Sequence, residues 1–158
     1  MDKETIQDKW PHEGTFCWGC GKNNDHGLQL QSYWDDDVAI ATWTPKKQHI
    51  AFPGILNGGI IATLIDCHTT GTANAAAHKM NEDSSDTHFM YVTGSLSVKF
   101  LRPTPLGKPV TLRAQVSEIK GNRIIVTCSL YSGDDQCAIG EVVTVRVDRE
   151  TFLNQFGN

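Results

Sequence analysis

Asp66 is the one carboxylate in a long and mostly apolar stretch of this chain, residues 60–77. A carboxylate in such surroundings is disfavoured unless it is paired, hydrogen-bonded or kept for chemistry. Shortly before it, Gly58 and Gly59 follow Asn57. Glycines at the start of a helix let a ligand approach free backbone N–H groups, which suit a developing oxyanion. Such donors, together with a carboxylate acting as general base or nucleophile, could perform acyl transfer.

The pattern around these residues predicts the element that holds them. A proline and glycine turn, an asparagine of N-cap type and a proline-free apolar run to Ala77 predict a loop that feeds a long, buried helix. In an ideal helix Gly58 and Asp66 lie about 12 Å apart, at about 1.5 Å per residue. That is too far for both to act on one carbonyl, so two chains must share each site if both residues act.

The rest of the chain has the pattern of strands. Alternating side chains in residues 27–33 and 38–43 predict a hairpin around Asp35, Asp36 and Asp37, and we interpret this acidic triplet as a solvated turn and not as a cation site. Four further strand-like runs, joined by turn residues, predict an antiparallel meander: residues 91–101, 109–119, 123–131 and 136–148. About six strands and one long helix give an α+β fold, and residues 81–88 have the composition of a loop.

Length and charge narrow the classes of function. With 158 residues and 39% hydrophobic content, the chain is predicted to form a single domain, residues 1–158, with an amino-terminal arm over residues 1–16. The formal net charge of −4 and pI of about 5.8 argue against nucleic-acid binding and against an anionic membrane surface. No apolar stretch is long enough to span a bilayer and the first residues are too charged for a signal peptide, so we expect a cytoplasmic protein.

The five cysteines of this chain, an odd number, make a disulfide framework improbable, and reduced thiols are expected. Cys17 and Cys20 form a lone C-x-x-C pair that could hold zinc together with His12 or His26. The alternative is a glycine-rich turn in which the thiols pack as small apolar groups. No second pair follows at zinc-finger spacing, so we assign no metal to this chain.

Two motifs resemble those of a known family. In the first, the Gly58-Gly59 pair is followed after four residues by Leu64 and then by Asp66; the second is residues 96–107, Leu-Ser-Val-Lys-Phe-Leu-Arg-Pro-Thr-Pro-Leu-Gly. They resemble the hotdog-fold acyl-CoA thioesterases of the phenylacetate-degradation type, and the likeness extends from about Cys17 to Val147. It implies a long helix wrapped by an antiparallel sheet, dimers that pair into tetramers, and cofactor-free hydrolysis of an acyl- or aryl-CoA thioester at a subunit interface.

The resemblance also implies roles for individual residues. Gly58 would polarise the thioester carbonyl through its N–H, Asp66 would be the base or nucleophile, and Thr93 would orient water or the carboxylate. The family usually has His-Gly-Gly where this chain has Asn57-Gly58-Gly59. We count Asn57 among the catalytic candidates because it can cap the helix and donate hydrogen bonds, although it cannot titrate near neutral pH as imidazole does.

Four residues are candidates for substrate binding. Gly59 lies at the helix start, Phe52 and His49 lie in the loop that leads to it, and Arg102 ends a predicted strand. Phe52 would pack either on the acyl or aryl group or against the start of the helix. His49 is more typical of a surface-loop histidine than of a catalyst, and Arg102 would either meet the coenzyme A phosphates or be a solvated cation.

Two other functions stay open from the sequence. A hotdog hydratase or dehydratase would normally need a carboxylate–histidine pair, and Asn57 counts against it. His68 lies only two positions after Asp66 and therefore faces another side of the helix, so we interpret it as structural or exposed. A non-catalytic acyl-CoA-binding or regulatory module would keep the pocket without turnover, and Asn57 in place of histidine favours it.

Overall fold

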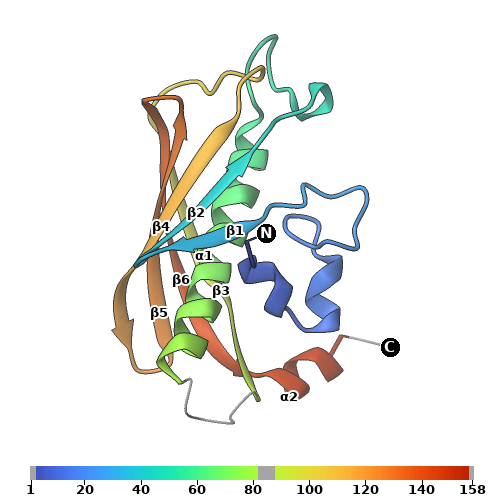
Figure 1. Ribbon diagram of the computed structural model, residues 1–158, viewed down its shortest axis with the longest axis vertical. Helices are drawn as coiled ribbons and strands as arrows, with labels where there is room; N and C mark the ends of the chain where they lie inside the picture. The colour runs from blue at the N-terminus through green and yellow to red at the C-terminus, as the bar shows by residue number, and fades with distance from the viewer. Residues whose placement is uncertain (1–2, 82–87, 157–158) are drawn as a thin grey trace.

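A computed structural model describes residues 3–81 and 88–156 of the chain (Figure 1). The long helix α1 (Gly58–Met80) lies along a curved six-stranded antiparallel sheet, and the amino-terminal segment lies beside the helix (Figure 1). The strands are β1 (Ser32–Asp35), β2 (Val38–Trp43), β3 (Phe89–Phe100), β4 (Val110–Lys120), β5 (Arg123–Ser132) and β6 (Asp135–Asp148). Short elements are the 3-10 helices η1 (Ile6–Lys9), η2 (His12–Phe16) and η3 (Lys47–His49), and the helix α2 (Arg149–Asn154). One helix wrapped by an antiparallel sheet is the hotdog arrangement, so the predicted α+β class is confirmed.

The order of the strands differs from the predicted meander. The sheet runs β1-β2-β4-β5-β6-β3, so β4, β5 and β6 form a meander while β3 pairs with β6 and not with β4. The connection of residues 101–109 is long enough to carry the chain across the sheet, and turn-like composition does not reveal which strands pair. As a result, β3 is an edge strand of the sheet.

Element boundaries depart from the prediction mainly near the amino terminus. Strand β2 has the predicted bounds, but residues 27–31 are not a strand, because Gln29 has a φ of 53° and the N–H groups of Leu28 and Leu30 donate to the carbonyls of Trp18 and Gly19. Helix α1 continues past Ala77 to Met80, and α2 was not predicted. Most of the predicted loop 81–88 lies outside the described residues.

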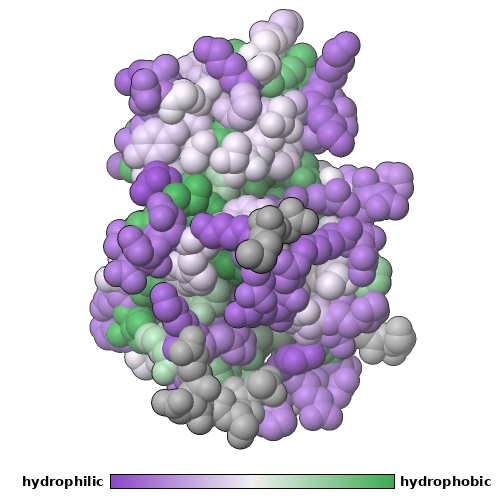
Figure 2. All heavy atoms as spheres, in the orientation of Figure 1, coloured by the Kyte–Doolittle hydropathy of each residue, from purple (hydrophilic) through white to green (hydrophobic). Residues whose placement is uncertain are grey.

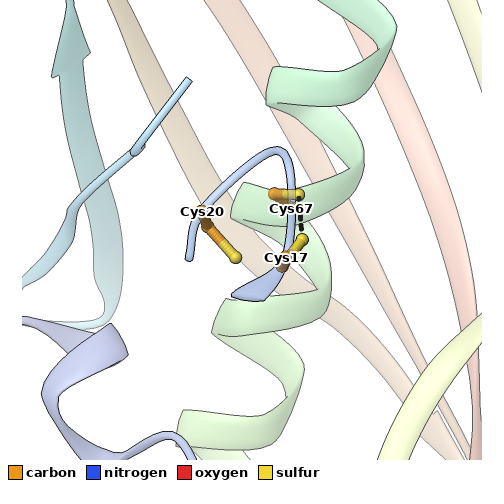
Figure 3. A group of neighbouring side chains, drawn as sticks. All are labelled: Cys17, Cys20 and Cys67. Carbon is orange, nitrogen blue, oxygen red and sulfur yellow. Dashed lines mark hydrogen bonds between the residues drawn. The ribbon is translucent and has the colours of Figure 1, made fainter. Parts of the chain in front are cut away.

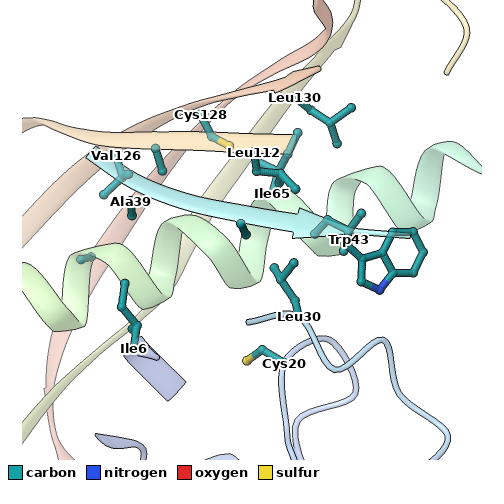
Figure 4. Packing of buried hydrophobic residues seen from close by; sticks show 14 of the residues in the cluster. Ile6, Cys20, Leu30, Ala39, Trp43, Ile65, Leu112, Val126, Cys128 and Leu130 are labelled. Carbon is teal, nitrogen blue, oxygen red and sulfur yellow. The ribbon is translucent and has the colours of Figure 1, made fainter. Parts of the chain in front are cut away.

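The core lies between α1 and the concave face of the sheet. Ile65 of α1 packs among the fully buried Leu112, Val126 and Leu130 of β4 and β5 (Figure 4). The face shown in Figure 2 carries mostly hydrophilic side chains over the amino-terminal segment. In the described part of the chain, no helix has the length and apolar character needed to cross a membrane.

His68 is a buried part of this core. Its Nδ1 lies 2.8 Å from the hydroxyl of Ser32 and its Nε2 lies 3.0 Å from the carbonyl oxygen of Ala39. Burial lowers the pKa of His68 to about 4, although the hydrogen bond with the Ala39 carbonyl opposes this shift. The structural interpretation of His68 is therefore confirmed, and His68 is not exposed.

The buried histidine predicts acid sensitivity of the fold. Between pH about 6.5 and 4 the unfolded chain binds a proton that folded His68 does not, so stability is complete above pH 6.5 and falls as the pH is lowered. The expected loss is about 3 kcal/mol, from about 1.4 kcal/mol per pKa unit. Denaturant unfolding at pH 7.5 and 4.5 measures it. In His68→Gln the difference between the two pH values should shrink; an unchanged difference would assign the acid sensitivity to other groups.

Candidate active site

The start of α1 leaves one backbone donor open. Asn57 caps the helix through its side-chain oxygen, which accepts from the N–H of Gly59 at 2.8 Å and from that of Ile60 at 3.2 Å. The Ile61 N–H donates to the Asn57 carbonyl. No acceptor among the described residues occupies the N–H of Gly58. The sequence motif therefore produces a helix start with one free donor, as an oxyanion-binding group needs.

Two turns further along α1, the Asp66 carboxylate is held by threonines. Its Oδ1 accepts from the hydroxyl of Thr93 on β3 at 2.6 Å and, at a longer 3.5 Å, from the hydroxyl of Thr70. The two hydroxyl oxygens lie 3.0 Å apart. Among the described residues nothing donates to Oδ2, so one carboxylate oxygen is fixed and the other is open to a water or a substrate.

The position of Thr93 is set by a residue that the sequence analysis missed. Asn74 of α1 donates its side-chain amide to the carbonyl of Tyr91 at 2.9 Å and accepts from the N–H of Tyr91 at 2.9 Å. These two hydrogen bonds between the Asn74 side chain and the Tyr91 backbone fix β3 against α1, two residues before Thr93. A register shift between Thr93 and Ser95 follows, and such bulges re-aim side chains near active sites.

A signal for Asn74 was present in the sequence. Asp66, Thr70 and Asn74 are spaced by four residues each, so their side chains lie along one stripe of a mostly apolar helix. A polar stripe on a buried helix must meet polar partners, and here the stripe meets the first half of β3. The logic that singled out Asp66 would have found Asn74 as well.

Asp66 and Thr93 open onto a cavity of about 510 Å³ between α1, β3, α2 and the amino-terminal segment. Most of its wall is apolar or aromatic, and charged groups join it from η1, η2 and α2. Apolar lining residues are Trp10, Pro11, Phe89, Met90, Tyr91, Val92 and Leu153; charged lining residues besides Asp66 are Lys9, Glu13 and Arg149. Its size and lining are those of a site for a small apolar group next to a carboxylate.

Gly58 is not part of this cavity in the same chain. The residues that line it come from the middle and end of α1, whereas Gly58 is the first residue of the helix. Next to Gly58 lies the ring of Phe100 from the other end of β3, 3.3 Å from where a Cβ at this position would be. Each chain therefore carries a carboxylate at one place and an open N–H donor at another, about 12 Å away by the ideal helix rise.

The predicted substrate-binding residues lie at the Gly58 end of the molecule or on its surface. His49 is buried, which makes the surface-loop interpretation wrong: its ring lies 4.9 Å from that of Trp43, its Nδ1 accepts from the Lys46 N–H, and its carbonyl accepts from the Asn57 N–H. Burial, and then the charge of Lys46, lowers the pKa of His49. Its backbone carbonyl thus supports the Asn57 cap, and its ring holds the loop that precedes the helix.

Phe52 and Arg102 are both exposed. Phe52 is 72% exposed, which argues against an anchoring contact with the start of its own helix. Arg102 forms a surface ion pair with Asp135 at 3.0 Å, and such exposed pairs contribute little to stability. Neither residue meets Asp66 within one chain, and both are exposed enough to contact a ligand.

In the described part of the chain, one group of side chains has the composition of a metal site. The sulfur atoms of Cys17, Cys20 and Cys67 lie within 4.8 Å of one another. Neither His12 nor His26, the partners considered from the sequence, belongs to this group, and Cys67 takes their place.

Comparison with known proteins gives a consistent family assignment. The sequence profile of the Thioesterase superfamily matches residues 53–139, more than half of the chain. Acyl-coenzyme A thioesterase THEM4 of Mus musculus is 29% identical over 103 residues, which are 64% of this chain and 40% of that protein. This chain therefore spans about two fifths of the length of that relative.

Solved structures agree in fold. A thioesterase superfamily protein from Shewanella loihica PV-4 is 35% identical, with a TM-score of 0.66 over 88% of this chain and 96% of that one. The PaaI protein of the E. coli phenylacetic acid degradation operon has a TM-score of 0.63 at 19% identity, over 76% of this chain and 80% of that one. The second likeness, at this low identity, shows the fold alone.

Proposed function

Because this chain belongs to the thioesterase superfamily, we propose that it is an acyl-CoA thioesterase that hydrolyses a coenzyme A thioester to a free acid and coenzyme A. The observation that supports this most is the Asp66 carboxylate, fixed by Thr93 through one oxygen and open at the other, at the wall of a largely apolar cavity. The acyl or aryl group would fill that cavity, and no cofactor takes part in the proposed reaction.

The proposed chemistry uses two groups on opposite sides of the thioester. The Gly58 N–H, at the positive end of the α1 dipole, donates to the carbonyl oxygen and stabilises the charge that develops there. Asp66 takes a proton from water that attacks the carbonyl carbon, or attacks that carbon itself; the carbon–sulfur bond then breaks and the thiolate leaves. In the second route the acyl group stays on Asp66 as an anhydride, and water then hydrolyses it to the free acid and the free carboxylate. Thr93 keeps the carboxylate oriented in either route, and Asn57 keeps the helix start in place.

The same arrangement supports a homodimer with shared sites. Antiparallel pairing of two α1 helices about a two-fold axis would bring Gly58 of one chain to Asp66 of the other, twice per dimer. Strand β3 is an unpaired sheet edge, and from Thr93 onward its side chains are largely exposed, including Leu96 and Phe100. A long edge with exposed apolar groups favours association. The homotetramer, the cytoplasmic location and the single domain with an amino-terminal arm stay predictions from the sequence.

The shared site also assigns roles to the four candidate substrate-binding residues. Gly59, Phe52, His49 and Arg102 lie near the Gly58 end or on the nearby surface, so in a dimer they would serve the site whose carboxylate comes from the partner. Phe52 and Arg102 would contact substrate directly, whereas His49 would act through the Asn57 cap.

A panel of acyl- and aryl-CoA esters tests the proposal. Release of free thiol is measured for each ester, next to hydration of crotonyl-CoA by the same preparation. Thiol release with no hydration is the expected result. Hydration without thiol release would assign a hydratase instead.

A non-catalytic acyl-CoA-binding module is the second candidate, because Asn57 replaces the histidine usual in the family and its side-chain oxygen is used as a helix cap. Saturable binding of the same esters, measured by calorimetry, without thiol release would favour this function. The two outcomes are separated because binding and turnover are measured on the same preparation.

The Thr93 hydroxyl is expected to contribute substantially to turnover. Thr93→Val removes the 2.6 Å hydrogen bond to Asp66 at similar volume, and hydrogen bonds to charged groups are worth about 1.5–3 kcal/mol, so kcat should fall about 10- to 100-fold. Thr93→Ser keeps the hydroxyl and should retain most activity. Equal activity of the valine variant and wild type would remove Thr93 from the site.

A further inference from the structure

Three cysteine sulfurs that are distant in the sequence meet at the wall of the cavity. Cys17 and Cys20 come from the loop that follows η2, and Cys67 comes from the middle of α1; all three side chains point toward one another (Figure 3). The sulfurs of Cys17 and Cys67 are 3.8 Å apart, and all three lie within 4.8 Å. None is in a disulfide, in which the sulfurs would be about 2.05 Å apart.

We propose that Cys17, Cys20 and Cys67 form a binding site for one zinc-class cation, with a fourth position left to water or to a ligand from the cavity. Zinc–sulfur bonds of about 2.3 Å at tetrahedral angles place two sulfurs about 3.8 Å apart. The Cys17–Cys67 pair already has this separation, and the remaining pairs need to close by at most about 1 Å to reach it.

The backbone of the loop is shaped for this cluster. A Cβ at Gly19 would overlap the sulfur of Cys67, so glycine lets the loop lie this close to α1 with the Cys67 sulfur in its present place. A Cβ at Gly21 would overlap backbone atoms of Thr15 and Cys17, so only glycine lets the loop turn back on itself here. If the thiols only packed as small apolar groups, the loop would not need to approach both α1 and its own backbone this closely. A site that brings three sulfurs together needs both close approaches.

The surroundings of the sulfurs favour negative charge. Backbone N–H groups of Gly19 and Cys20 donate to the Cys17 sulfur, and Trp10 hydrogen-bonds the Cys20 sulfur. A divalent cation would bind the three cysteines as thiolates, and the displaced protons would go to solvent.

The proposed ion would fasten the amino-terminal segment to the central helix. Cys17, Trp10 and Gly14 form one wall of the cavity, and Cys67 directly follows Asp66 in α1. The ion would hold that wall in place next to the carboxylate. This role does not depend on the proposed hydrolysis, because the site is assembled from residues outside that chemistry.

Zinc itself is the probe for the test. The full chain is reduced, stripped with a chelator, given Zn2+ and freed of excess ion, and the retained zinc is measured by elemental analysis. About one zinc per chain is expected. Reduced, folded protein that retains none overturns the proposal.

Variants and labelling locate the ion. Cys67→Ser and Cys17→Ser should weaken zinc binding by about 100-fold or more, since even partners outside the ligand shell change affinity 10- to 100-fold. Cys137→Ser, which changes a buried cysteine of β6 outside the cluster, is the matched control and should bind as wild type does. Cobalt bound by the wild type should show the charge-transfer absorption of thiolate ligands. Unchanged binding by Cys67→Ser would refute the site.

Alkylation of the wild type keeps the test decisive if a variant does not fold. Iodoacetamide labelling, mapped by mass spectrometry, compares the apo and zinc-loaded protein. Zinc is expected to protect Cys17 and Cys67, both of which reach solvent or the cavity in the structure. Labelling of these two residues at the same rate with and without zinc would contradict the proposal.

Discussion

Asp66→Asn is expected to lower turnover of the preferred acyl-CoA ester at least about 100-fold, the effect typical of losing a general base. Asparagine has nearly the same shape, and its carbonyl oxygen can still accept the hydrogen bond from Thr93, so the fold and the contact between α1 and β3 should persist. What disappears is the negative charge and with it the capacity to take a proton or to attack the carbonyl carbon. The kcat for thiol release measures the loss.

The control for this variant is an aspartate-to-asparagine substitution outside the candidate site. Asp36→Asn makes the same substitution in the exposed turn between β1 and β2, where a φ of 52° suits asparagine as well as aspartate, and full activity is expected. Circular dichroism and the unfolding midpoint should match wild type for both variants. An Asp66→Asn protein with normal turnover would exclude Asp66 from the reaction and would leave the cavity as a binding site.

The helix and its chemical residues were predictable because their signals are local. Asn57 before two glycines marks the start of α1, and a lone aspartate in an apolar run stands out against its neighbours. The Asp66–Thr93 contact was not visible in the residues themselves, since it joins segments 27 positions apart and depends on how β3 is placed. Only the resemblance to a family suggested Thr93.

Features fixed by tertiary contacts escaped the sequence reasoning. The strand order could not be read from turn composition, because β3 pairs with the last strand of the sheet and not with the next one. The role of His49 was missed for a similar reason, since a histidine in a short loop looks exposed until Trp43 covers it. The cysteine cluster depends on α1 delivering Cys67 to a loop 50 positions earlier in the chain, and the sequence offered only the Cys17–Cys20 half.

Mixing two inactive variants is expected to restore activity if each site is built from two chains. One chain carries Asp66→Asn. The other carries Gly58→Pro, which deletes the N–H of the first helical residue. Proline is favoured at this first position, and Asn57 before it has the extended conformation (φ −61°, ψ 131°) that a residue preceding proline adopts, so the helix should form. Phe100, 56% exposed, can move away from the added ring.

Gly58→Ala distinguishes the effect of losing the N–H donor from the effect of adding bulk next to Phe100. It places a Cβ at the same distance from Phe100 but keeps the N–H, so it should retain far more activity than the proline variant. Both inactive variants must fold and form dimers on their own, as sedimentation and circular dichroism can verify. Only then does recovery of activity report on the composition of the site.

The extent of recovery follows from counting sites. After random subunit exchange half of the dimers are mixed, and each mixed dimer has one site with both changes and one with neither, so activity should approach about a quarter of wild type. A site contained within one chain would give no recovery, because each chain would still lack one of its own two groups. Full exchange without activity, or an active monomer at high dilution, would refute the shared site. Recovery to about a quarter would place Gly58 and Asp66 of different chains at one thioester, as their separation along α1 requires.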